Sequence, residues 1–152
     1  MLRVTRETDY GILLLTSFVR FCDLSLLTTR QVAKETGVPY KMTCKILNIL
    51  AKQGLLTSQR GLSGGYRLSR EPETITLRDI VSALEGPIAL TECSKEEDCA
   101  CELEERCETR NYWKVINQAF RDSLSRITLS SLVKAGPANL LPYVTLADNG
   151  HH

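Results

Sequence analysis

The chain has 152 residues, enough to bury a hydrophobic core without disulfides, and its 19 Lys and Arg nearly balance its 18 Asp and Glu, so the net charge of +1 identifies no partner. It shows no secretory signal, and charged residues interrupt its most apolar stretch, residues 10–27, so we expect a cytoplasmic protein that contacts no membrane. In a reducing cytoplasm its six cysteines are more typical of metal ligands or redox centres than of disulfides.

The distribution of charge along the chain is more informative than its sum. Residues 1–70 contain 11 Lys and Arg against 4 Asp and Glu, a net charge of +7, whereas residues 92–108 contain 2 against 8, a net charge of −6. The basic half favours a polyanionic partner, and the acidic segment does not.

The basic half of the chain begins with sequence signals for two helices. Thr5 is expected to cap a first helix that runs to about Phe21, with apolar residues at helical spacing on one face. Thr28 and Gln31 form a capping-box pattern, in which each side chain satisfies a backbone amide of the other residue. This pattern predicts a second helix at Arg30–Thr36.

A third helix follows after a very short turn. Gly37 supplies a left-handed turn, and Pro39 suits the first turn of a helix that we expect to reach Gln53. Two helices joined in this way are typical of a helix-turn-helix, whose second helix presents polar side chains to the major groove of DNA. The predicted DNA contacts from this part of the chain are Arg30, Tyr40, Lys41, Thr43 and Lys45.

A β-hairpin is predicted directly after the helix pair. Strands at residues 55–60 and 66–69 flank a turn that contains three glycines, which makes the hairpin the wing of a winged helix. A helix-turn-helix or a glycine-rich hairpin alone also occurs in proteins that bind no DNA, but the two together with the basic charge favour DNA binding. The wing residues expected at the DNA are Arg60, Ser63, Gly64, Gly65, Tyr66 and Arg67.

The acidic segment contains four cysteines: Cys93, Cys99, Cys101 and Cys107. A capped helix beginning near Thr76 and ending at Gly86-Pro87 leads into it. The segment has few large apolar residues, so a bound metal would supply order that it lacks alone. Its spacings, C-x5-C, C-x-C and C-x5-C, fit a zinc ribbon poorly and suit an iron-sulfur cluster better, with zinc and redox thiols as the alternatives.

A last long helix is expected from Thr109 to about Leu132. Its apolar residues recur every three or four positions, which predicts a coiled-coil-like dimer seam, with an intramolecular core helix as the alternative. The expected seam residues are Trp113, Ile116, Phe120, Leu124 and Ile127. No motif follows in the tail, where His151-His152 resembles the start of a purification tag.

The predicted fold class is mainly α with a small β-wing: a winged helix-turn-helix domain followed by a long C-terminal dimerisation helix. We expect the DNA-binding domain at residues 1–88, a cysteine-rich cluster-binding loop at 89–108, the dimerisation helix at 109–133 and a tail at 134–152. An enzyme is not expected, because the neighbouring carboxylates raise thiol pKa values and no His precedes the terminal pair.

Four segments occur in the order seen in the Rrf2 family of winged-helix transcription regulators, which the chain resembles over about residues 1–133: Leu2–Tyr10, Gln59–Tyr66, Ile75–Pro87 and Cys93–Cys107. The resemblance is closest to regulators of iron-sulfur cluster assembly. It implies a homodimer that binds a palindromic operator on double-stranded DNA. It also implies a 2Fe-2S or 4Fe-4S cluster that senses iron-sulfur status, nitric oxide or redox state.

The resemblance also suggests ligands for the cluster. Family members that bind a cluster use three cysteines here, and Cys93 and Cys107 match the first and the last. The middle ligand is either Cys99 or Cys101, of which Cys101 is favoured because the residues after it resemble the cluster-assembly regulators. The remaining cysteine is then a spare thiol or a fourth ligand.

A fourth ligand from outside the cysteine segment is the other possibility. Some members have a His three residues after the last cysteine, but Arg110 stands at that position here. Nitric-oxide-sensing members use a carboxylate in the first helix, and Asp9 aligns with it. Alternatively, Asp9 only stabilises the positive N-terminal end of its helix. A zinc-structured or thiol-disulfide repressor without a cluster keeps the same DNA-binding half and is the alternative function.

Overall fold

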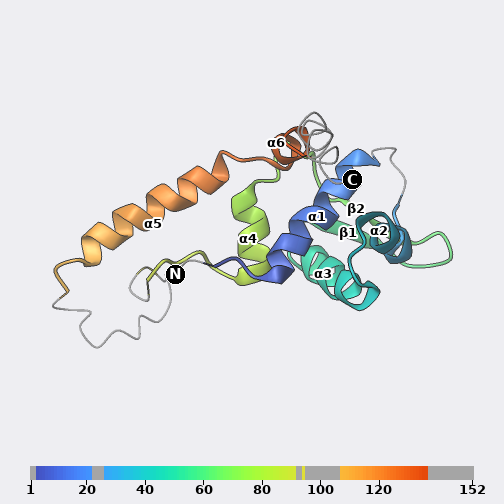
Figure 1. Cartoon of the computed structure of the whole chain (residues 1–152), viewed down its shortest axis with the longest axis horizontal. Helices are drawn as coiled ribbons and strands as arrows, with labels where there is room; N and C mark the ends of the chain where they lie inside the picture. The colour runs from blue at the N-terminus through green and yellow to red at the C-terminus, as the bar shows by residue number, and fades with distance from the viewer. Residues whose placement is uncertain (1–2, 22–25, 92–93, 95–106, 137–152) are drawn as a thin grey trace, which may run out of the picture.

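The computed structural model describes residues 3–21, 26–91, 94 and 107–136 of the chain. Figure 1 shows α1–α4, a two-stranded wing and α6 gathered into one body, from which α5 extends away. This arrangement confirms the predicted fold class. None of the helices in this part of the chain is long and apolar enough to cross a membrane. The elements are α1 (Arg6–Arg20), α2 (Thr29–Thr36), α3 (Tyr40–Lys52), β1 (Leu56–Gln59), β2 (Gly65–Leu68), α4 (Leu77–Glu85), α5 (Arg110–Ser125) and α6 (Leu129–Lys134).

The helix ends follow the predicted capping signals. The Thr5 hydroxyl accepts a hydrogen bond from the amide of Thr8, and Thr28 forms the complete capping box with Gln31. Gly37 ends α2 with a left-handed φ of 72°, a conformation that costs glycine little. Pro39 is the N-cap of α3 rather than a residue of its first turn. The helix-turn-helix is thus confirmed to within a residue or two at each boundary.

The core lies where α1 and α3 cross. Leu14 and Leu15 of α1 are completely buried there against Ile46 and Leu50 of α3 and the residues around them. The buried face of α3 also contains Thr43, which the sequence pattern had placed outside. The expectation that Thr43 faces DNA is therefore wrong.

Thr43 can be buried because its hydroxyl has hydrogen-bond acceptors within the protein. Its hydroxyl lies 3.3 Å from the carbonyl oxygen of Val38 and 3.2 Å from that of Pro39, and it donates to these acceptors at the start of the helix. A buried hydroxyl with such partners costs little, and its methyl group packs like that of valine.

The wing is an antiparallel pair with a register that runs from Leu56 opposite Leu68 to Gln59 opposite Gly65. Its second strand also pairs with the segment before α2. The amide of Leu27 donates to the carbonyl of Tyr66 at 2.9 Å, and the amide of Tyr66 donates to the carbonyl of Leu27 at 2.8 Å. These two hydrogen bonds fix the wing relative to the helix-turn-helix.

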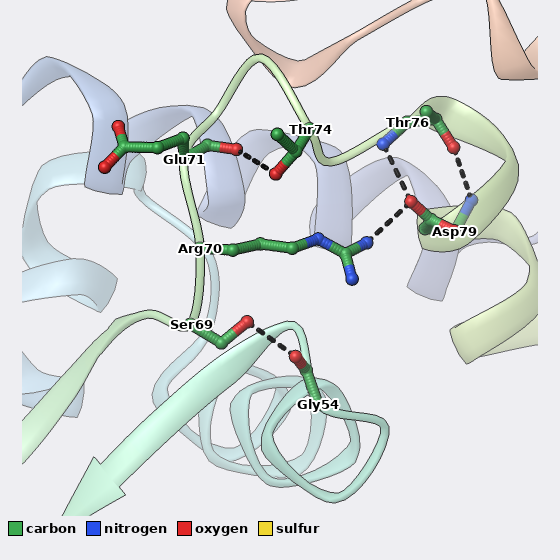
Figure 2. A network of polar contacts seen from close by, with 7 residues as sticks. All are labelled: Gly54, Ser69, Arg70, Glu71, Thr74, Thr76 and Asp79. Atoms are coloured by element: carbon green, nitrogen blue, oxygen red, sulfur yellow. Dashed lines mark hydrogen bonds and ion pairs between the residues drawn. The ribbon is translucent and has the colours of Figure 1, made fainter.

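Polar contacts hold the connection between the wing and α4 (Figure 2). The hydroxyl of Ser69 donates to the carbonyl of Gly54 at 2.6 Å, which closes the base of the wing. The Arg70 guanidinium donates to the carboxylate of Asp79 at 2.7 Å. The same carboxylate accepts from the amide of Thr76 at 3.0 Å and thereby completes a second capping box, at the start of α4.

The other end of α4 is joined to α1. One carboxylate oxygen of Glu85 accepts hydrogen bonds from the amide of Thr5 at 2.9 Å, its hydroxyl at 2.6 Å and the hydroxyl of Thr8 at 2.5 Å. These hydrogen bonds stabilise the charged carboxylate and lower the pKa of Glu85 below its ordinary value. The first turn of α1 therefore depends on an acid at the end of α4.

The predicted single helix from residue 109 to about residue 133 is wrong at one point. The chain leaves the helix after Ser125, and Thr128 caps the separate helix α6. Backbone pairing across the body causes the break, since the amide of Leu77 donates to Ile127 and the amide of Leu129 donates to Ile75, both at 2.8 Å. Leu129 is completely buried in the core, so α6 belongs to the winged-helix body.

Candidate nucleic-acid interface

A shallow hollow of about 520 Å³ lies between α2, α3 and the wing, and we call it the wing hollow. Its lining offers guanidinium, phenol and backbone groups, which are the donors that proteins use to hold the phosphates of DNA. Six of the predicted DNA contacts lie together in this lining: Arg30, Tyr40, Arg60, Gly64, Gly65 and Tyr66.

Two glycines of the wing are required by the close approach of neighbouring backbone. A Cβ atom on Gly65 would lie 2.6 Å from the carbonyl oxygen of Leu27, and one on Gly64 would lie 2.4 Å from that of Gln59. Both distances are well inside van der Waals contact, so side chains at these positions would push the wing away from α2 or distort its turn. The glycines of the sequence motif therefore shape the hollow.

Tyr40 opens α3 and is the most exposed aromatic side chain on the hollow, with 55% of its surface accessible. A side-chain hydrogen bond with the Cys44 thiol, one turn further along the helix, raises the pKa of Tyr40 above its ordinary value of 10.0. A tyrosine phenol is neutral at physiological pH even without this shift, so the group can donate a hydrogen bond to a phosphate or a base.

Four other predicted contacts are exposed on α3 and the wing, the elements that border the hollow. Lys41 and Lys45 are exposed on α3, one helical turn apart. Ser63 lies at the exposed tip of the wing, and Arg67 is exposed on β2. The ammonium group of Lys45 forms an ion pair with the carboxylate of Glu7 on α1, at 2.5 Å.

The apolar stripe of α5 is only partly covered by the described part of the chain. Trp113 and Ile116 are 37% and 45% exposed, and Ile127, beyond the end of the helix, is 36% exposed. Phe120 and Leu124 are partly buried. The intramolecular alternative is therefore not supported, because these side chains do not fill a core within the described part of the chain.

The inward face of α5 is polar and holds the backbone that leads to the cysteines. Asn117 is 4% exposed, accepts from the amide of Leu90 at 3.0 Å and donates to the carbonyl of Ile88 at 3.3 Å. Arg121 is 8% exposed and donates to the same carbonyl at 3.0 Å. The segment before Cys93 is thus attached to α5 through buried hydrogen bonds.

Only part of the predicted ligand set can be placed. Cys93, Cys99 and Cys101 lie outside the described residues, and the described residues contain no group of three candidate metal ligands. The hydroxyl of Thr109, 3.4 Å from the Cys107 sulfur, lowers the pKa of this thiol, with smaller contributions from backbone amides and Arg110. A lowered thiol pKa favours the thiolate, which is the form that binds metals.

Asp9 is exposed on the first turns of α1. Figure 1 shows the start of α5 well separated from the start of α1.

Comparison with known proteins identifies the chain. A family model for Rrf2, described as an iron-dependent transcriptional regulator, matches residues 4–135. The chain belongs to the Rrf2 family. It is accordingly a DNA-binding transcription regulator and not an enzyme. This confirms the resemblance seen in the sequence motifs.

Relatives of this Rrf2 regulator match along nearly its whole length. The protein rrf2 of Nitratidesulfovibrio vulgaris is 30% identical over 141 residues, which cover 93% of this chain and 92% of that protein. CymR (YrzC), the global cysteine regulator of B. subtilis, superposes with a TM-score of 0.68 at 27% identity, covering 90% of this chain and 99% of CymR. The structure of T. potens IscR gives a TM-score of 0.65 at 27% identity, covering 90% of each chain.

Several residues on the surface of this Rrf2 regulator were not expected from its sequence. The wing hollow is also lined by uncharged polar side chains that were not among the predicted DNA contacts. On α5, Tyr112 and Val115 are 67% and 70% exposed and widen the apolar face beyond the predicted stripe. The additional side chains that line the hollow are Thr28, Thr29, Asn48, Ser58 and Gln59.

Proposed function

We propose that this Rrf2 regulator is a homodimer that binds a palindromic operator and changes its affinity with the state of an iron-sulfur cluster in the cysteine segment. The observation that carries the DNA-binding part is the wing hollow, where α2, α3 and the wing present Arg30, Tyr40 and Arg60 on one surface. In this arrangement the start of α3 enters the major groove, and the wing follows the adjacent backbone or minor groove.

Base reading is assigned to the start of α3 and phosphate binding to the basic residues around the hollow. Lys41→Ala and Arg60→Ala should each weaken operator binding, and the loss of one phosphate contact should lower the slope of log K against log salt by about 0.9. Lys52→Ala is the matched control, because it removes the same charge roughly 16 Å further along α3. Unchanged affinity in both test variants would show that the DNA surface is elsewhere.

Dimerisation is assigned to α5. Its apolar face stays partly exposed within the described part of its own chain, and a second copy of α5 has the matching stripe. Ile116→Asp should yield a monomer in analytical ultracentrifugation. Asn111→Asp adds the same charge on the exposed polar side of the helix and should leave the dimer intact. A dimer that survives Ile116→Asp would exclude this seam.

The cluster would be held by Cys93, Cys107 and either Cys99 or Cys101, with Asp9 as the candidate fourth ligand. The lowered pKa of Cys107 suits this role because it favours the thiolate. Because the starts of α1 and α5 are well separated within one chain, we assign the Asp9 ligand to the partner subunit of the dimer. A bound cluster would supply a centre that responds to iron, oxidants or nitric oxide.

Buried polar contacts connect this segment to the rest of the molecule. Asn117 and Arg121 attach its first residues to α5, and Glu85, immediately before Gly86, attaches the end of α4 to α1. A change in the shape of the cysteine segment would therefore act on the dimer helix and on the first turn of α1 together. This change would alter the spacing between the two DNA-reading surfaces of the dimer and thereby its affinity for the operator.

Anaerobic purification tests the sensor separately from the DNA surface. The cluster predicts a coloured protein with matching iron and sulfide contents, and Cys107→Ala should remove the colour. Cys44→Ala is the matched control, because Cys44 lies on α3 within the body. A colourless protein with stoichiometric zinc, or with thiols that form a disulfide on oxidation, would exclude the cluster and favour the zinc-structured or thiol-disulfide repressor. The DNA-binding assignment would not be affected.

A further inference from the structure

Glu7 is an acidic side chain at the edge of the basic surface. It lies in the first turn of α1, and its carboxylate reaches across to the ammonium of Lys45 on α3, 38 residues further along the chain. The two side chains keep 32% and 55% of their surface accessible. The pair is therefore formed in contact with solvent, where DNA phosphates can compete for it.

Lys45 follows Lys41 by one helical turn, so the two ammonium groups belong to the same face of α3. Lys41 has no ion pair among the described residues, whereas Lys45 is neutralised by Glu7. A carboxylate in this position opposes DNA binding because it holds a cation that would otherwise bind a phosphate.

We propose that Glu7 is a specificity-determining residue that restrains Lys45 and thereby lowers the affinity for non-operator DNA. Binding to DNA of any sequence is almost entirely electrostatic, whereas operator binding adds base contacts that do not depend on this lysine charge. Non-operator binding depends on lysine charge for nearly all of its free energy, so the cost of breaking the Glu7–Lys45 pair falls mainly on that complex. The operator complex can keep the pair intact and rely on its base contacts. Glu7 would thus limit occupancy of the large excess of competing sites.

This inference rests on the proposed DNA surface, and its test is a double-mutant cycle with a random-sequence duplex and an operator duplex. Glu7→Gln should bind the random duplex about 3- to 10-fold more tightly. The slope of log K against log salt should become steeper by about 0.9, the contribution of one phosphate contact. The gain on the operator should be smaller. In the Lys45→Ala background, Glu7→Gln should change neither affinity nor slope, because the released cation is absent.

Glu35→Gln is the matched control, because it removes one negative charge from an exposed position on α2 that forms no ion pair in the described part of the chain. The inference is overturned if Glu7→Gln and Glu35→Gln increase the affinity for the random duplex equally, or if Glu7→Gln still increases it in the Lys45→Ala background. Either result would mean that Glu7 acts only through the net charge of the protein. Loss of operator binding in Glu7→Gln would also overturn it.

The failure of the DNA surface itself would look different. In that case Lys41→Ala and Arg60→Ala would leave binding unchanged. If these two variants weaken binding while Lys45→Ala does not, the surface stands and the role of Glu7 is refuted. Urea unfolding of each variant verifies that affinities are compared between folded proteins.

Discussion

Replacement of Gly65 by alanine tests whether the position of the wing depends on contact with the segment before α2. The new Cβ would lie 2.6 Å from the carbonyl oxygen of Leu27, whereas ordinary contact begins at 3.4 Å, so the two segments must separate by about 0.8 Å. The two hydrogen bonds between Leu27 and Tyr66, at 2.9 and 2.8 Å, would then become too long to be effective. At about 0.5–1.5 kcal/mol each, their loss should lower the free energy of unfolding by about 1–3 kcal/mol.

The functional effect of Gly65→Ala should exceed its effect on stability, because the displaced wing no longer completes the hollow with α3. Urea unfolding gives the first quantity, and fluorescence anisotropy with an operator duplex gives the second. Leu62→Ala is the control, since Leu62 is fully exposed at the tip of the wing and its truncation empties no buried space. If Gly65→Ala matches the wild type in both measurements, the backbone contact does not position the wing.

Two further predictions concern the body of the domain. Leu129→Ala removes a completely buried side chain and should cost about 2–5 kcal/mol of unfolding free energy in urea titrations, whereas Leu62→Ala at the exposed tip of the wing should leave this free energy unchanged. Equal effects of the two variants would mean that Leu129 of α6 is not part of the core. The folded pKa of Glu85 lies below its unfolded value near 4.5, so its stabilising effect is present above that value and is lost as the pH falls through the folded pKa. Glu85→Gln should therefore be less stable than the wild type at pH 7 and equal to it in strong acid, and a difference independent of pH would exclude the charge of Glu85 as the cause.

The features that the sequence predicted correctly are those with a local cause. The capping residues Thr5, Thr28 and Thr76 satisfy amides within four positions of themselves, and Gly37 ends α2 through its own backbone conformation. The glycine-rich turn likewise predicted the hairpin correctly. Each of these signals depends on a few neighbouring residues, so a single sequence contains it in full.

The features that were predicted wrongly or missed depend mostly on contacts between residues that are distant along the chain. The break before Thr128 depends on backbone pairing with residues about fifty positions earlier, which overrides an apolar period that continues through it. Thr43 was misplaced because its hydroxyl is satisfied by the preceding turn, a fact that hydrophobicity does not reveal. The Glu7–Lys45 pair joins two helices, and no local pattern indicates it.

The backbone pairing of Ile75–Leu77 with Ile127–Leu129 has a consequence for how such a regulator can change over evolutionary time. It makes residues 78–126 an excursion whose two ends are joined at the body, and the sensor segment lies entirely inside it. The entropy cost of closing a loop grows only with the logarithm of its length, about 0.6 kcal/mol for each doubling. Insertions, deletions or new ligands in the cysteine segment, which lies between α4 and α5 in the sequence, therefore need not disturb the fold that reads DNA. One DNA-binding scaffold can in this way carry exchangeable sensors, and an engineered metal or peptide-binding loop could be introduced at the same place.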